Sequence, residues 1–128
     1  MHHSRLSQWI IDCRSDDIDA AAAFWSAALN RPARRLRDPA DAHYRRLATP
    51  PHEPGILLQQ VSHPSRVHLD IESDDIDAEV RRLERLGARR IEQVRTWWIM
   101  EAPTGHRFCV LPPQRPDLAE SGNRWDAP

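Results

Sequence analysis

The sequence lacks several features that mark particular protein classes. It has no lysine and only two cysteines, Cys13 and Cys109, among its 128 residues. Two cysteines are too few for the disulfide framework of a small secreted domain. No hydrophobic run approaches the roughly 18 residues that a membrane span requires, and no secretory signal opens the chain. These absences predict a cytoplasmic protein that is not embedded in a membrane.

The charges show no bias that would indicate a charged partner. The formal net charge is −1, and residues of both signs are interspersed along the chain. There is neither a basic stripe for nucleic acid nor an acidic tail. All 18 basic residues are arginine, which we interpret as the codon usage of a GC-rich genome and not as a binding site. We therefore expect no nucleic-acid partner and no membrane partner.

An internal repeat organises the chain. The six residues Ser15–Ala20 return unchanged at Ser73–Ala78, 58 positions later. Three further pairs of segments align in the same order: Ala33–Leu36 with Ala88–Ile91, Tyr44–Pro50 with Trp97–Pro103, and Gly55–Val61 with Gly105–Leu111. Two similar helix caps could arise by coincidence, but the ordered downstream matches favour a true repeat.

Each copy reads as a strand, a helix and three more strands. We expect strands at 8–13, 33–37, 43–48 and 56–61, with a helix at 17–29, and then strands at 67–72, 91–94, 96–100 and 108–111, with a helix from Ile76 to Leu86. Asp16 is the predicted N-cap of the first helix, and Gly87 ends the second. We expect residues 1–7 to be frayed and residues 113–128 to form an extended tail, in which Trp125 docks either on the body of its own chain or on a neighbouring chain.

This order predicts an α+β protein with two modules, at about 6–61 and 67–112, in one domain spanning 1–128. Halves of about 55 residues are marginal alone, so they should share a core or pair with another chain. Strand alternation in the second module places Val67, Leu69 and Ile71 on one face and His68, Asp70 and Glu72 on the other. The same alternation in the first module puts Ile10 and Asp12 on the face opposite Ile11 and Cys13.

Paired modules of this kind resemble the vicinal oxygen chelate superfamily, which includes glyoxalase I, extradiol dioxygenases, fosfomycin-resistance enzymes and bleomycin-binding proteins. The run His68–Ile71 leading into Asp74–Ala78, and the ending Ala102–Val110, are similar to the family's motifs. Ala102 and His106 depart from the Asp and Asn usual in that ending. The likeness is nearest to glyoxalase-like domain proteins, and it implies two sheets that roll into half-barrels around an inter-module cleft.

The resemblance also implies where a metal would bind. The family's four ligand positions fall here at Ile10, Gln59, His68 and Cys109. Only His68 is a good ligand for the usual divalent ions, since Ile10 offers no donor atom and Gln59 is a weak neutral one. We therefore predict a degraded site without a tightly bound cofactor. A divalent metal, if bound, would use His68, Gln59 and Cys109.

Several residues have two interpretations. Cys109 is either a reactive thiol beside His68 or a small buried hydrophobe. Trp97, Trp98 and Tyr44 either line an aromatic pocket or belong to the core. Asp70 and Glu72 could form an acid/base pair, whereas Asp12 and Asp70, as repeat mates, could have a structural part. We predict a ligand cleft lined by Ile10, Tyr44, Gln59, His68, Asp70, Trp97, Trp98 and Cys109, with His68 as the catalytic candidate.

Two functions follow from this interpretation. The chain is either a lyase or isomerase that acts on a small molecule, without true glyoxalase I activity, or a non-catalytic protein of the bleomycin-resistance type that sequesters a drug or metabolite. The sequence does not decide whether the chain is an enzyme. Arg-rich edge strands and the tail with Trp125 indicate a partner surface, so we expect a homodimer.

Overall fold

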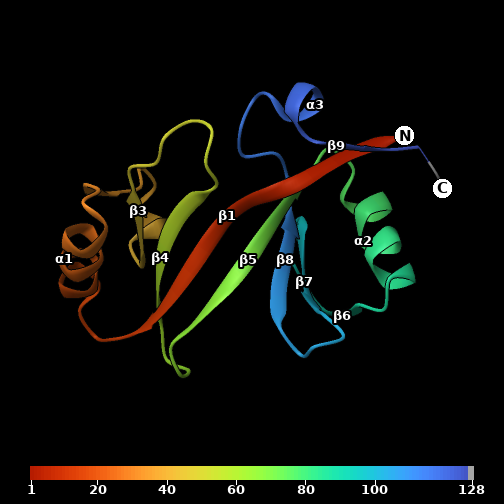
Figure 1. Cartoon of the computed structure of the whole chain (residues 1–128). Coiled ribbons are helices and arrows are strands. Elements are labelled where there is room, and N and C mark those ends of the chain that lie inside the picture. Colours follow the sequence, from red (N-terminus) through yellow and green to blue (C-terminus); the bar gives the residue numbers. More distant parts are fainter. Residues whose placement is uncertain (127–128) are drawn as a thin grey trace. The chain divides into compact units, whose positions relative to one another are not determined.

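The structure, a computed structural model, describes residues 1–126, and the chain divides into two compact units (Figure 1). The first unit is Gln8–His68. The second unit combines Met1–Ser7 with the chain from Leu69 onward. Both units are mixed α+β, as predicted. Among the described residues, every helix is too short or too polar to cross a membrane.

The first unit has a four-stranded sheet and one long helix. Its elements are β1 (His2–Arg14), α1 (Ile18–Leu29), β2 (Ala33–Arg35), a 3-10 turn η1 (Pro39–Asp41), β3 (Tyr44–Leu47) and β4 (Gly55–Val61). The strands lie in the order β2-β3-β4-β1. β1 and β4 run parallel, whereas the other neighbours are antiparallel.

The second unit repeats this plan. Its elements are β5 (Arg66–Ser73), α2 (Ile76–Arg85), β6 (Arg89–Val94), β7 (Trp97–Glu101), β8 (Arg107–Leu111), α3 (Leu118–Ser121) and β9 (Asn123–Trp125). The strands lie in the order β5-β8-β7-β6, with β5 and β8 parallel. The predicted order of strand, helix and three strands is thus confirmed in both units.

Strand register tests the repeat residue by residue. Asp12 lies opposite Gln59, and its repeat mate Asp70 lies opposite Cys109, the mate of Gln59. The alignment of Tyr44–Pro50 with Trp97–Pro103 was wrong by two residues. Arg45 lies opposite Arg35 as Met100 lies opposite Arg90, so Arg45 corresponds to Met100. The connections before β3 and β7 differ in length, and the sequence did not show where the gap falls.

The repeated hexapeptide is a helix-capping unit. Asp17 Oδ1 accepts a hydrogen bond from Ala20 N at 3.1 Å, and Asp75 Oδ1 accepts one from Ala78 N at 3.0 Å. Such caps satisfy amide groups that have no partner within the helix. The N-cap of α1 is therefore Asp17 and not Asp16 as predicted. The helix starts one residue later because Ser15 Oγ accepts a hydrogen bond from Asp17 N and holds the preceding turn.

The two helices end in the same way, as predicted for Gly87. Asn30 after α1 has a φ of 53°, and Gly87 after α2 has a φ of 108°. Both residues adopt the left-handed conformation that commonly ends a helix. A side chain at Gly87 would be strained for this reason, and its Cβ would lie 3.1 Å from Pro103 Cγ.

Each unit has its own apolar core between the helix and one face of the sheet. In the first unit Cys13, Ile18, Ala22, Leu47 and Leu58 form the buried cluster. In the second unit the cluster consists of Val80, Leu83, Met100, Phe108 and Val110. The opposite face of the strands carries Asp12 and Gln59 in the first unit and His68 and Asp70 on β5, as strand alternation predicts, together with the buried pair Ile10 and Leu57.

Both predicted loose ends of the chain are ordered. Residues 1–7 are not frayed, because His2–Ser4 pairs with β9 and the side chains of His2 and Ser4 are buried. The tail is not simply extended either, since it forms α3 and β9. Trp125 Nε1 donates a hydrogen bond to Ser4 Oγ at 2.9 Å. Arg82 lies over the Trp125 ring at 3.8 Å from its centroid, so this tryptophan packs on its own chain.

Candidate functional site

A histidine–aspartate pair lies on the polar side of the strands. His68 Nδ1 is 2.9 Å from Asp12 Oδ2, and the Asp12 side chain is only 1% exposed. A carboxylate only accepts hydrogen bonds, so the Nδ1 atom of His68 carries the shared proton. In the neutral imidazole this makes Nε2 the basic nitrogen, the atom with the chemistry to accept a proton or to coordinate a metal ion.

Two further basic side chains reach the same carboxylate. Arg66 Nε donates to Asp12 Oδ2 at 3.2 Å, and His63 Nε2 lies 3.9 Å from that oxygen. Within residues 1–126, the other oxygen, Oδ1, is buried and accepts no hydrogen bond. Asp12 is therefore a buried anion whose contacts are all on one oxygen. Its charge and the burial of Cys13 together raise the pKa of the Cys13 thiol, burial having the larger effect.

The structure brings together three of the residues singled out in the sequence. One ligand atom from each of His68, Asp70 and Cys109 lies within 4.8 Å of the others. His68 and Asp70 are two residues apart on β5, and Asp70 is opposite Cys109 on the neighbouring strand β8. An imidazole, a carboxyl group and a thiol thus converge on two paired strands. Asp70 takes a place in this cluster that the family likeness had given to Gln59.

The remaining predicted residues fall into separate places. Gln59 Nε2 donates to Tyr44 Oη at 3.3 Å on the sheet of the first unit. Ile10 is 2% exposed and lies opposite Leu57, so it contributes apolar surface. Trp98 packs against the core of the second unit. Its neighbour Trp97 points to the other side of β7, as strand alternation requires.

Three residues at the pair were missing from the predicted site. Asp12 was placed on the polar face and given a structural interpretation, and Arg66 and His63 lie between the two predicted modules, at 6–61 and 67–112, where no function was predicted. The alternation of β1 could have identified Asp12, because a carboxylate in an apolar strand needs a partner. Nothing local indicated that Arg66 and His63 reach Asp12, since more than 50 residues separate them in the chain.

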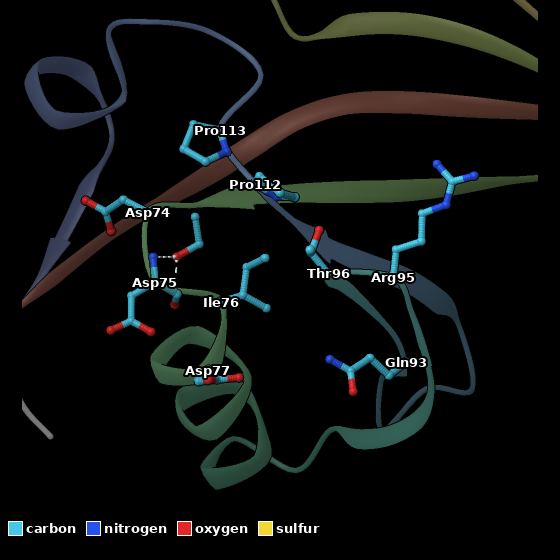
Figure 2. A pocket seen from close by; sticks show the side chains of 10 residues that line it. Asp74, Asp75, Ile76, Asp77, Gln93, Arg95, Thr96, Pro112 and Pro113 are labelled. Atoms are coloured by element: carbon cyan, nitrogen blue, oxygen red, sulfur yellow. Dashed lines mark hydrogen bonds between the residues drawn. The ribbon is translucent and has the colours of Figure 1, made fainter. Parts of the chain in front are cut away.

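A pocket of about 410 Å³ lies elsewhere in the second unit, at the start of α2 (Figure 2). Its lining includes Asp74, Asp75 and Asp77 from the segment before and within α2, and Arg95 from the β6–β7 turn. Two of these carboxylates already hold the fold together. Asp74 Oδ2 is 2.7 Å from His3 Nδ1, and Asp75 caps the helix. None of the predicted site residues lines this pocket.

Sequence comparison assigns most of the chain to one domain type. A family model described as "Glyoxalase-like domain" matches residues 8–111. A comparison with curated protein sequences finds no match.

Solved structures share the fold at low sequence identity. A hypothetical protein from Bacillus halodurans has a TM-score of 0.62 at 13% identity, covering 88% of this chain and 96% of its own. Methylmalonyl-CoA epimerase from Mycobacterium tuberculosis has a TM-score of 0.57 at 20% identity, covering 91% of each chain. A Streptomyces coelicolor methylmalonyl-CoA epimerase variant, solved with 2-nitronate-propionyl-CoA, has a TM-score of 0.56 at 14% identity, covering 88% and 96%.

Proposed function

Since the chain belongs to the glyoxalase-like domain family of the vicinal oxygen chelate superfamily, we propose that it binds a small molecule beside His68 and moves a proton on it. The reaction class is that of an isomerase or lyase acting next to a carbonyl group. The observation that carries the proposal is the 2.9 Å contact between His68 Nδ1 and the buried Asp12 Oδ2. Structures with the same fold include enzymes named methylmalonyl-CoA epimerase, whose named substrate is an acyl thioester. Acyl thioesters are therefore the first substrates to test.

The His68–Asp12 contact supports this chemistry in two ways. Asp12 fixes which ring nitrogen carries the proton, and it stabilises the imidazolium that forms when Nε2 accepts one. Asp70 and Cys109, both near His68, add an acidic group and a thiol to the same place. Positioned general acid–base groups contribute typically about 10²–10⁴-fold in rate.

The donor set also fits a zinc ion, although the family's usual four positions do not. Zinc accepts imidazole, carboxylate and thiolate, and catalytic zinc sites use three protein ligands. His68 Nε2, Asp70 and Cys109 would hold the ion, with Asp12 orienting His68. A zinc ion on Nε2 would occupy the nitrogen that accepts the proton, so His68 would be a ligand in zinc-loaded protein and a base only in metal-free protein. A bound zinc would polarise a substrate carbonyl and lower the pKa of its water. We propose that Ile10 and Gln59 take no part, which leaves the family's original set degraded.

Exchange of a substrate's α-proton for deuterium tests the catalytic proposal directly. Small acyl thioesters and α-hydroxy and α-keto acids would be incubated with the protein in D₂O, and exchange followed by proton NMR. His68→Ala should lower the exchange rate at least about 100-fold. His63→Ala is the matched control, because His63 reaches the same carboxylate oxygen only at 3.9 Å and is 40% exposed. Equal exchange by wild type and His68→Ala would rule out His68 as the base.

Metal content is measured alongside. Mass spectrometry of tag-free protein incubated with zinc should give near one equivalent, lost in both His68→Ala and Cys109→Ala. Zinc retained by both variants would exclude this donor set, without affecting the proton-transfer proposal.

A non-catalytic binding protein is the second candidate. The buried Ile10 and the Gln59–Tyr44 hydrogen bond favour it, because they leave apolar and neutral groups where the resemblance implies metal ligands. A ligand that raises the melting temperature without α-proton exchange would support this candidate. His68→Ala would then weaken binding only modestly.

A further inference from the structure

The outer surface of α1 is unlike that of its repeat mate α2. Every residue of α1 is apolar except Asp19 and Ser26. Ala20, Ala23, Phe24, Ala27 and Ala28 are exposed and lie together on the side of α1 that faces away from its core. We call these five residues the α1 face. A helix that is apolar all round normally has its outer side covered.

The repeat supplies an internal comparison for this surface. α2 occupies the corresponding place in the second unit, and its exposed positions carry charges. Ala23 corresponds to Arg81, Ser26 to Glu84 and Ala27 to Arg85. The exposed side of the helix is thus charged in the second unit and apolar in the first. The fold alone therefore does not explain why the α1 face is apolar.

We propose that the α1 face is the interface of a homodimer, in which α1 packs against α1 of a second copy around a two-fold axis. This proposal does not depend on the proposed function. The α1 face thereby takes the place of the interface predicted from the sequence, which consisted of the Arg-rich edge strands and the tail with Trp125. Trp125 packs on its own chain. Arg34 and Arg35 on β2 would oppose their own copies if the edges paired, and like charges opposite one another are destabilising.

Shape and charge both favour a second copy as the occupant. Four alanines in the α1 face allow two helices to approach closely, and Phe24 projects from them with 63% of its surface exposed. An antiparallel pair also brings the exposed Asp16, before the start of α1, towards the half-buried Arg31, after its end, on the other copy. Arg31 donates to Glu53 of its own chain at 3.2 Å, so the Asp16 contact would add a second carboxylate to this guanidinium. A two-fold axis makes this contact twice, as isologous interfaces require.

The area of the α1 face predicts a weak dimer. Phe24 exposes roughly 100–150 Å², because aromatic side chains carry about 150–250 Å². With its alanines the whole face offers roughly 300 Å², the size of the largest apolar patch on a typical monomer. Adding a polar rim, two copies would bury about 1,000–1,200 Å², the lower limit of specific interfaces. Since interfaces at this lower limit belong to weak or transient complexes, we expect a dimer that forms only at high protein concentration.

Sedimentation velocity of the full chain from 1 to 500 μM tests the proposal. Wild type should shift from monomer to dimer across this range. Ala27→Arg, which installs the residue type that α2 carries at the equivalent position, should stay monomeric at 500 μM. Arg85→Ala is the matched control on α2 and should dimerise like wild type. Circular dichroism verifies that each variant is folded.

Two results would overturn the proposal. One is a wild-type protein that remains monomeric at 500 μM, and the other is a dimer that Ala27→Arg does not weaken. Ala23→Glu provides an independent second variant if Ala27→Arg does not fold. Binding of monomeric wild type to anionic phospholipid vesicles, lost in Ala27→Arg, would assign the α1 face to a membrane surface and would also overturn the dimer.

Discussion

Asp12 is the residue on which the candidate site depends. It is buried, and its Oδ2 atom is contacted by His68, Arg66 and the more distant His63. Basic groups on one oxygen offset the cost of burying a charge. Asp12 and Asp70 are repeat mates and occupy equivalent register positions, yet only Asp70 lies beside a possible metal ligand on its neighbouring strand, Cys109. The repeat has thus diverged at this pair of positions.

Replacing Asp12 by Asn should distinguish an effect of Asp12 on His68 from a contribution of Asp12 to the packing of the fold. The amide keeps the volume but no longer stabilises an imidazolium, so we expect α-proton exchange to fall about 10²-fold or more. NMR exchange rates at pH 7 measure this effect. An unchanged exchange rate with a reduced melting temperature would show that Asp12 serves only the fold.

At the scale of elements, the sequence predicted the strands and helices well because their patterns are local. The apolar spacing of α2 and the alternation of β5 are each contained in fewer than a dozen residues. The errors concern contacts between distant segments. Met1–Ser7 and residues 113–126 look polar and irregular, and they become ordered only because they pair with each other. The cluster of His68, Asp70 and Cys109 was partly predicted, because strand alternation places His68 and Asp70 on the same face of β5.

Glu79 in α2 should control part of the acid stability. Its side chain is fully buried, with His2 Nε2 and Arg82 Nε both 2.8 Å from Oε1. Burial acts to raise the pKa of Glu79, but the hydrogen bonds from Arg82 and His2 outweigh it, and the net pKa is below the ordinary 4.5. A lowered folded pKa stabilises the protein above pH 4.5, and this stabilisation is lost as pH falls through the folded value.

Glu79→Gln should therefore lower the free energy of unfolding at pH 7 by about 3 kcal/mol, because it removes one partner of a buried ion pair. The decrease in stability below pH 4.5 should become shallower. Some decrease remains, since Asp74 also has a pKa lowered by hydrogen bonds from His3 that outweigh its burial. Urea unfolding between pH 3 and 7 measures this. Glu84, on the same helix as Glu79, makes an exposed pair with Arg90 of β6, and Glu84→Gln should cost under about 1 kcal/mol.

Trp125 should stabilise the pairing of the C-terminal strand β9 with the start of β1. Trp125→Ala removes a hydrogen bond to Ser4 and the stacking of Arg82, and we expect a loss of about 2 kcal/mol in unfolding free energy. Trp125→Phe keeps the ring but not the donor, so it should lose about 1 kcal/mol. Equal stability of both variants and wild type in urea would show that β9 does not hold the start of β1.

At the scale of the whole molecule, the compact units do not coincide with the sequence halves. The chain begins with seven residues that belong to the second unit, although the remainder of β1 belongs to the first. Those residues supply partners to buried acids of the second unit. His2 contacts Glu79, and Arg5 lies 3.5 Å from Glu72 and 2.6 Å from Asp117. The hydrogen bond from Arg5 lowers the pKa of Asp117 to about 2.

Deletion of residues 2–7 should consequently destabilise the distant half of the sequence more than the half from which they are removed. Native-state hydrogen exchange should accelerate about 100-fold or more in α2 and β8, since two buried ion pairs lose a partner and each loss costs about 3 kcal/mol or more. Exchange in α1, β3 and β4 should change far less. His2→Ala combined with Arg5→Ala, which keeps the backbone of β1, should reproduce the acceleration in α2. Uniform acceleration across both units would mean that they unfold as one cooperative body, and the division at Gln8 and His68 would then have no energetic counterpart.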